Sequence, residues 1–420
     1  MNPYLKRVEN HWGIYSAEFS KSLPNNLSQY AYIFPSSCRN PEIESYFHPS
    51  LRMKAIFLHI LRIPRSTLRG FDAILRKRFG YFKIVENKNS NLLTVAPSLL
   101  CKQVNNNVTS NYLSSFDQKN TSWLIFEDGK NTNSTLTRTE VFKLLIYFLV
   151  SLSKTLFKKP ADIPYSDWIG ALSSNLTWCL SCYWSDKIAL EKFTTNFLKT
   201  RYISHIHCVH EFHPHSKILW KICSTNKIKC SSIEHASNER EKLWLFPTQQ
   251  EVMNNHPLPS LLFVYNEKHK QWWHDIFDDL VNFQIACGPR FAKWKCSNNL
   301  LPYKSNKVLL VTSQSWWDNE VIFQTIEKLL DSNFELTIRL HPHSQLKKWQ
   351  KKWLYNKLKN TRIEVDNSPL EKSISNHSII LGMCSTVLDE ALLMGRCSIK
   401  VEHDEFSSLG SSLSFSTNIN

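Results

Sequence analysis

The sequence predicts an α/β fold with two Rossmann-like domains, because two stretches of the chain alternate short apolar runs with helix-like segments. In the segment 307–401, apolar runs at 308–312, 334–340, 362–365, 379–381 and 397–401 alternate with amphipathic segments at 319–330, 345–358, 369–376 and 386–394. This alternation is typical of βαβ units with a buried parallel sheet. An upstream stretch repeats it, with expected strands at 203–209, 228–233, 260–265 and 281–286 and helices at 216–226 and 268–280.

The length of the chain also favours two domains. At 420 residues and 49.2 kDa it is too long for one ordinary hydrophobic core. The polar segment 296–306 separates the two βα stretches, and such segments are typical of domain boundaries. We therefore expect an N-terminal domain with basic helical insertions at residues 1–295 and a C-terminal domain at residues 303–420.

The charge of the chain indicates an acidic partner. A formal net charge of +15 suits nucleic acid, anionic lipid or a phosphorylated substrate. No zinc-finger spacing, arginine-rich tract or ribonucleoprotein motif occurs, so we expect no nucleic-acid partner. The N-terminus does not resemble a secretory signal, and no apolar run approaches the roughly 20 residues of a spanning helix. With 11 cysteines and no export signal, we expect a reduced, cytoplasmic protein at the inner face of the membrane.

Three segments of the N-terminal half carry specific structural expectations. Residues 51–83 hold nine Arg and Lys with Asp72 as the only acid, and their apolar residues fall on one helical face on either side of Pro64. A basic amphipathic hairpin of this kind can lie on an anionic membrane, and an ordinary pair of packed helices with a solvated basic face fits equally well. The segment 141–159 predicts a buried core helix, and 30–34 predicts a strand.

Two clusters in the C-terminal domain directly follow expected strands. They are Arg339-Leu340-His341-Pro342 and Gly382-Met383-Cys384-Ser385-Thr386. Right-handed crossovers place the carboxyl ends of parallel strands at one edge of the sheet, where doubly wound folds bind ligands. Ser385 and Thr386 stand at the start of an expected helix, whose amide groups attract phosphate, although an ordinary helix cap explains them as well.

Candidate bases follow strands in the N-terminal domain. Asp128 ends an apolar run within Glu127-Asp128-Gly129, where a carboxylate suits general base catalysis and where Asp-Gly is equally a turn dipeptide. Glu211 and His235 end two further expected strands. The pair Cys179 and Cys182 could join histidines in 205–215 in a zinc site, but no second such pair follows, and we expect no bound metal.

At these residues the sequence resembles bacterial surface-carbohydrate glycosyltransferases of the GT-B class. The segments that carry the resemblance are IKCSSIEHASN, LLFVYNEKHKQWW, ACGPRF, TIRLHPHS and GMCSTVLDEALLMG. Bacterial sialyltransferases share an acidic pair before Gly, a His-Pro pair and a Ser/Thr pair in that order, which are here Glu127-Asp128-Gly129, His341-Pro342 and Ser385-Thr386. The Kdo-transferase-like group is also similar. The resemblance implies two Rossmann-like domains that face each other across a cleft.

The resemblance also implies roles for individual residues. Asp128, or in its place Glu211 or His235, would be the catalytic base. His341, Ser385 and Thr386 would bind the donor phosphate, and Glu390 the ribose. The donor site would further include Arg339 for charge, Pro342 to stiffen the loop and Gly382 for close backbone approach.

The implied reaction is transfer of a sialic-acid- or Kdo-like sugar from a CMP-activated donor. The acceptor would be a glycan or lipid-linked glycan, such as capsule or lipopolysaccharide. No Asp-X-Asp motif is present, so we expect transfer without metal or other cofactor. Two alternatives stay open: a CDP-polyol-dependent polyol-phosphate transferase, and an inactive scaffold of GT-B fold that binds glycan or membrane.

Overall fold

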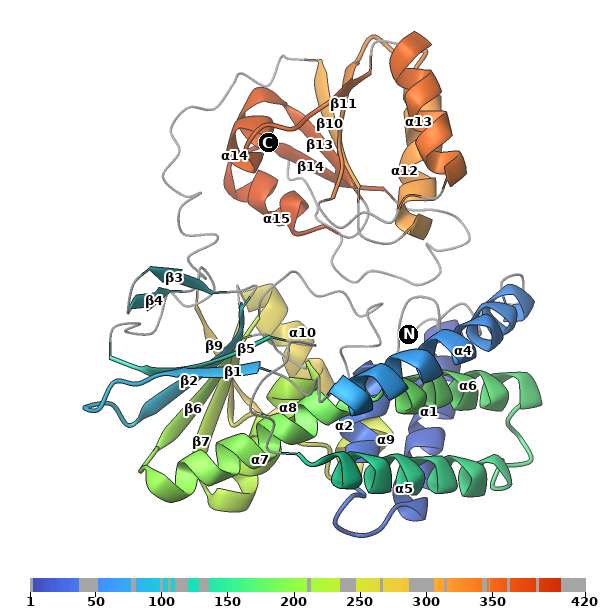
Figure 1. The fold of residues 1–420 in the computed structure, drawn as a ribbon. Coiled ribbons are helices and arrows are strands. Elements are labelled where there is room, and N and C mark those ends of the chain that lie inside the picture. The colour runs from blue at the N-terminus through green and yellow to red at the C-terminus, as the bar shows by residue number, and fades with distance from the viewer. Residues whose placement is uncertain are drawn as a thin grey trace. The chain divides into compact units, whose positions relative to one another are not determined.

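The structure, a computed structural model, describes residues 3–37, 52–76, 81–98, 101–104, 107–109, 120–127, 136–209, 213–234, 247–264, 267–286, 306–312, 316–341, 346, 348–360, 363–382 and 385–401. The chain divides into two compact units (Figure 1). Unit 1 comprises Met1–His235 and Lys242–Gly288, and unit 2 comprises Ala236–Glu241 and Pro289–Asn420. Each unit contains a parallel sheet with helices, so the predicted α/β class with two Rossmann-like units is confirmed. The predicted boundary segment 296–306 lies outside the described residues except for its last residue.

Unit 1 is built on a seven-stranded sheet with the order β1-β5-β2-β6-β7-β8-β9. All neighbours pair in parallel except β1, which runs antiparallel to β5 at one edge. Strand β2 is followed in this sheet by β5 on one side, whereas β6 is followed by β7 on the other side. The topological switch point of the sheet therefore lies between β2 and β6. The strands are β1 Tyr81–Val85, β2 Leu92–Pro97, β5 Ser122–Glu127, β6 His205–Val209, β7 Lys229–Ile233, β8 Leu261–Val264 and β9 Asn282–Ile285, and β3 Lys102–Val104 pairs separately with β4 Asn107–Thr109.

Helices cover this sheet and extend beyond it in a helical layer. Figure 1 shows α4, α6 and α5 lying next to one another in that layer, consistent with their mutual contacts. Their core includes four fully buried tryptophans, Trp12, Trp168, Trp184 and Trp220. The helices are α1 Pro3–Ser22, α2 Tyr30–Ser37, α4 Arg52–Arg76, α5 Arg138–Leu156, α6 Tyr165–Ser181, α7 Trp184–Thr200, α8 Pro214–Asn226, α9 Gln249–Met253 and α10 Glu267–Phe277, which a 3-10 turn at Asp278–Leu280 extends.

The strand predicted at 30–34 is wrong, because these residues begin helix α2. Aromatic and β-branched residues favour strands locally, but tertiary contacts decide here. The Tyr30 hydroxyl donates a hydrogen bond to the Glu191 carboxylate of α7. The Lys221 ammonium of α8 lies 4.3 Å from the centre of the Tyr30 ring. Through these contacts α2 packs on α7 and α8, which favours the helix at 30–34.

The hairpin or pair of helices predicted at 51–83 is also wrong, because α4 continues through Pro64 as one helix and Tyr81–Val85 forms strand β1. Proline removes one backbone hydrogen bond and usually kinks or ends a helix. In α4 the loss is offset by packing on α6. A Cβ atom on Gly70 would lie only 1.9 Å from the Leu180 carbonyl oxygen, so the two backbones are in direct contact. Glycine permits this close crossing.

The helix predicted at 141–159 is confirmed as part of α5, but only one of its faces is buried. Its start is fixed by a capping box, in which the Thr137 hydroxyl accepts from the Glu140 N–H and the Glu140 carboxylate accepts from the Thr137 N–H. Val141, Phe148 and Leu152 are buried on its inner face. Its outer face is exposed, with Phe142, Ile146, Tyr147 and Val150 each more than 40% accessible. Within the described residues no helix has the length and apolarity of a membrane span.

Unit 2 is a five-stranded, fully parallel sheet with the order β12-β11-β10-β13-β14. Numbered along the chain this is the order 3-2-1-4-5, which is typical of nucleotide-binding doubly wound folds and places the switch point between β10 and β13. Leu310, Ile322, Ile326 and Ile338 form part of the core. The elements are β10 Lys307–Val311, α12 Trp316–Leu329, β11 Glu335–Arg339, α13 Lys348–Asn360, β12 Glu364–Val365, α14 Leu370–Asn376, β13 Ile379–Gly382, α15 Thr386–Leu393 and β14 Cys397–Lys400.

Candidate functional site

The predicted donor residues of unit 2 follow strands that end side by side. Val311, the last residue of β10, pairs in register with Arg339 at the end of β11 and with Gly382 at the end of β13. The clusters at 339–342 and 382–386 therefore flank the carboxyl end of β10 at the switch point. Ligands of doubly wound sheets bind at this position.

Thr312 ties two of these strand ends together, and sequence analysis did not single it out. The backbone N–H of Thr312 donates to the Arg339 carbonyl oxygen at 3.0 Å. Its side-chain Oγ1 accepts a hydrogen bond of 2.8 Å from the backbone N–H of His341. Thr312 is almost completely buried, whereas His341 is partly exposed. Thr312 thus fixes the backbone from which the His341 imidazole projects. A hydroxyl residue at the end of the expected strand 308–312 was the available sequence signal.

Ser385 is the N-cap of helix α15. Its backbone is extended, and its Oγ accepts a hydrogen bond of 3.3 Å from the Val387 N–H. This contact confirms the helix-cap interpretation of Ser385. The same geometry leaves the start of α15 at the switch point, where the helix dipole and the amide groups of the first turn favour an anion. Ser385 and Thr386 are both partly exposed there.

Gly382 is explained by packing within unit 2. A Cβ atom at this position would lie 2.6 Å from Cγ2 of Val311 and 3.5 Å from Cδ2 of Leu388. Valine is branched at Cβ and has little rotamer freedom with which to move aside. The close contact between β13 and β10 therefore requires glycine, independently of any ligand.

Arg339 is engaged inside unit 2. Its Nη1 donates to Asp366 Oδ2 at 2.8 Å, to the Ser368 carbonyl oxygen at 2.6 Å and to Ser373 Oγ at 2.9 Å. Burial acts to raise the pKa of Asp366, but hydrogen bonds from Ser373, Ser368 and Arg339 outweigh it and lower that pKa. The guanidinium thus connects β11 to the start of α14, which is a structural role for a residue that sequence analysis assigned to the donor.

The two acids of α15 differ in accessibility. Glu390, expected to hold the ribose, is only 1% exposed. Asp389, the preceding residue, is partly exposed. The ribose role of Glu390 stays a prediction.

The candidate bases Asp128, Glu211 and His235 lie outside the described residues, as does Pro342. The strands that precede the three bases are described. They are β5, β6 and β7, which run parallel within the order β5-β2-β6-β7. The choice between these bases stays a prediction.

A buried acid–base pair at the same edge was missed by sequence analysis. Glu234, directly after β7, is 1% exposed, and both of its carboxylate oxygens lie 2.9 Å from Nδ1 of His269. The indole N–H of Trp273 donates to the same carboxylate at 2.9 Å. His269 and Trp273 lie one turn apart on α10, so these contacts attach α10 to the end of β7. Their spacing of four residues was the signal in the sequence.

Further buried polar groups surround the start of α8. His215 and Lys217 are fully buried in its first turns. The His215 ring lies 4.5 Å from that of Phe126 at the end of β5, and its Nε2 lies 3.3 Å from the Val209 carbonyl oxygen. Lys187 of α7 lies over the Phe126 ring at 5.8 Å from its centre. Two basic side chains, His215 and Lys187, thus lie against the Phe126 ring near the end of β5.

Among the residues that the structure describes, Cys179 and Cys182 do not lie in a group with histidines that could hold a metal ion. Both cysteines are buried in the helical core, and burial raises the pKa of the Cys182 thiol to about 12. His205 and His207 instead bind the Ser231 hydroxyl, at 2.7 and 2.8 Å.

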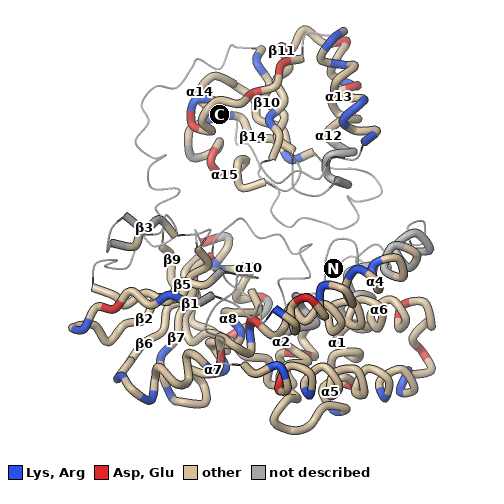
Figure 2. The backbone as a smooth tube through the Cα atoms, viewed as in Figure 1, with Lys and Arg blue, Asp and Glu red and all other residues tan. Residues whose placement is uncertain are grey.

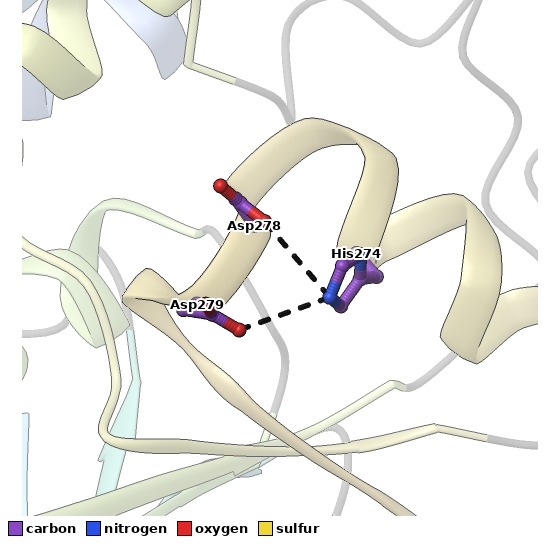
Figure 3. A group of neighbouring side chains, drawn as sticks. All are labelled: His274, Asp278 and Asp279. Carbon is purple, nitrogen blue, oxygen red and sulfur yellow. Dashed lines mark ion pairs between the residues drawn. The ribbon is translucent and has the colours of Figure 1, made fainter.

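One surface group in unit 1 has the side chains of a cation site. His274, Asp278 and Asp279 place their ligand atoms within 4.8 Å of one another at the end of α10 (Figure 3). The His274 Nε2 lies 4.0 Å from Asp278 and 3.9 Å from Asp279. All three side chains are exposed, and exposed acidic groups are common without an ion. We assign no metal to this group.

Comparison with known proteins identifies no family. No protein-family model matches the chain, and a search of curated proteins finds no match. Among solved structures, the chain is similar to the UDP-GlcNAc 2-epimerase of Methanocaldococcus jannaschii in complex with UDP-GlcNAc and UDP. The sequence identity is 15% and the TM-score 0.35, over 54% of this chain and 69% of that chain. A second structure of that enzyme gives 16% identity and a TM-score of 0.36 over 54% and 70% of the two chains. The fold assignment therefore rests on the sheet topology itself.

Proposed function

We propose that the protein is a glycosyltransferase that moves a sialic-acid- or Kdo-like sugar from a CMP-activated donor to a surface glycan, without a metal ion. The observation that carries the donor part is the register of β11, β10 and β13. It brings His341, Thr312 and the start of α15 to the switch point of a 3-2-1-4-5 sheet.

The proposed chemistry uses two groups of residues. In the first, Asp128, Glu211 or His235 takes a proton from an acceptor hydroxyl, which then attacks the anomeric carbon. In the second, the departing nucleotide phosphate is stabilised by the His341 imidazole and by the dipole of α15. Both act on charge that develops during the transfer.

The acceptor is proposed to be a glycan or lipid-linked glycan at the inner face of the cytoplasmic membrane. The net charge of +15 and the basic helix α4 support an anionic surface as its location.

The donor proposal is tested by thermal stabilisation with CMP, CDP, UDP, GDP and ADP. A ligand at about 100 times its dissociation constant adds roughly 2.7 kcal/mol of stability. We expect CMP to raise the unfolding midpoint of the wild type, and His341→Ala to lose most of this effect because the phosphate loses a hydrogen-bond donor.

His274→Ala is the matched control, since His274 is an exposed histidine of the other unit. It should keep the full response to CMP. A response to CDP alone would replace the CMP donor with a CDP-polyol. If no nucleotide stabilises the protein, the transferase proposal is wrong.

A further inference from the structure

Helix α4 carries an exposed apolar stripe along most of its length. Phe57, Ile60, Leu61, Leu68, Phe71 and Leu75 are between 53 and 70% exposed. Measured from Phe57, they stand 3, 4, 11, 14 and 18 residues along the chain, close to whole turns of the helix, so they lie on one face. Apolar side chains this exposed and this regularly spaced mark an interaction surface. We call this set the α4 stripe.

The opposite side of α4 is fixed to unit 1. Gly70 lies against the Leu180 carbonyl, and Ala73 and Ile74 pack on the core. The stripe is therefore turned outward by the packing of α4 on α6. A rotation that buried it would separate the Gly70–Leu180 contact.

Arginines line one flank of the α4 stripe. Arg62, Arg65, Arg69 and Arg76 follow at spacings of three, four and seven residues, which places them on one side of the helix. Figure 2 shows the basic segments of α4. Asp72 is the one acid of the helix, and its Oδ1 lies 2.6 Å from Nε of Arg76. An apolar face with an arginine flank complements an anionic bilayer.

A recess of about 450 Å³ opens on this flank between α4 and the α6–α7 junction. Its lining includes Arg65, Leu68 and Arg69 from α4, and Tyr183 from the junction. Nη1 of Arg69 donates to the Tyr183 hydroxyl at 2.9 Å. Asp72 and Asp186 also line it, and Asp186 is almost completely buried. The recess thus places Arg65 and Arg69 beside the exposed side chain of Leu68, and the charge of Asp72 in it is paired with Arg76.

We propose that α4 lies in the surface of an anionic phospholipid bilayer, with the α4 stripe among the acyl chains and a lipid phosphate at Arg65 and Arg69. Guanidinium groups bind phosphate through paired N–H donors, and Tyr183 has the amphipathic character of residues at membrane interfaces. This inference rests on the membrane location in the proposed function, and it is independent of the donor chemistry.

Co-sedimentation of the full chain with vesicles tests the inference. Vesicles of phosphatidylcholine with phosphatidylglycerol should bind the wild type, and vesicles of phosphatidylcholine alone should bind it weakly. Leu68→Ser/Phe71→Ser should weaken binding about tenfold or more, because two apolar side chains no longer enter the bilayer. Arg65→Gln/Arg69→Gln should weaken it about tenfold and reduce its dependence on salt.

Matched double variants serve as controls. Tyr202→Ser/Met253→Ser removes two other exposed apolar side chains of unit 1, and Lys351→Gln/Lys352→Gln removes two exposed charges of unit 2. Both should bind vesicles like the wild type. Equal losses in these controls, or equal binding to neutral vesicles, would overturn the inference.

Two further measurements separate the remaining explanations. Sedimentation equilibrium shows whether the protein forms a dimer. If the protein binds no vesicles but forms a dimer that Phe71→Ser dissociates, the α4 stripe binds a second copy of the chain and not a membrane. CMP stabilisation of the α4 variants tests the donor site separately. Retained CMP binding with no vesicle binding would reject the membrane surface alone, whereas the reverse result would reject the donor site alone.

Discussion

The buried histidine His207 couples the folding of unit 1 to pH. It lies in the middle of β6, fully buried, with Nδ1 2.8 Å from the Ser231 hydroxyl. Burial, with a further contribution from the charge of His205, lowers the pKa of His207 from 6.5 to about 3. The histidine is therefore neutral in the folded protein at pH values where the unfolded chain already binds a proton.

We expect the stability of unit 1 to fall as the pH drops below about 6.5. The unfolded state binds more protons in this range, so its free energy falls relative to the folded state by up to about 1.4 kcal/mol per pH unit until about pH 3. Urea unfolding of the wild type and His207→Gln at several pH values measures the effect. The variant should show a shallower slope, whereas exposed His274→Gln should match the wild type. Equal slopes for His207→Gln and wild type would contradict the prediction.

Arg339 and Gly382, which sequence analysis assigned to donor binding, each have a structural role in unit 2. Arg339 and Gly382 stand at the switch point as predicted, yet Arg339 binds Asp366 and Ser373, and Gly382 accommodates Val311. His341 differs, because Thr312 holds its backbone while its side chain is partly exposed. The donor role of His341 stays a prediction.

Helix α4 is the element that joins the fold of unit 1 to its proposed membrane surface. It passes through Pro64 without ending, and its orientation depends on the contact of Gly70 with α6. A glycine in a helix interior normally destabilises by roughly 0.5–1 kcal/mol relative to alanine. The contact with Leu180 offsets this cost only while position 70 has no side chain.

Gly70→Ala should therefore destabilise unit 1, opposite to the usual effect of this substitution in a helix. A Cβ atom 1.9 Å from the Leu180 carbonyl oxygen forces α4 away from α6, at a cost of about 1–3 kcal/mol. Urea unfolding gives the sign, and hydrogen exchange of the α4 amides should show faster opening. Ser66→Ala in the same helix is the control and should have little effect. A stabilised Gly70→Ala would show that α4 does not cross α6 at this position.

At the scale of the whole molecule, each unit has its own sheet and its own hydrophobic core. Units built in this way can unfold as separate cooperative transitions. The donor candidates with described positions all belong to unit 2, whereas α4 belongs to unit 1.

Calorimetry should resolve two transitions, of which CMP raises only the one that belongs to unit 2. Gly70→Ala should lower the other transition and leave the nucleotide-sensitive one in place. A single transition that CMP shifts as a whole would show that the two units unfold together.

From the sequence alone, strands β6 to β9 of unit 1 and the alternating strands and helices of unit 2 could be predicted, because periodic burial in a parallel sheet is a local pattern. Strand β1 at Tyr81–Val85 was not predicted, since its first residues were included in the segment expected to be helical. The sequence also determined the residues that follow each strand, including His341 and Ser385. Tertiary structure alone decided that 30–34 is helical, that α4 passes through Pro64, and that Glu234 binds His269 and Trp273. These features depend on contacts between residues far apart in the chain, and such contacts outweigh local preferences when the side chains are buried.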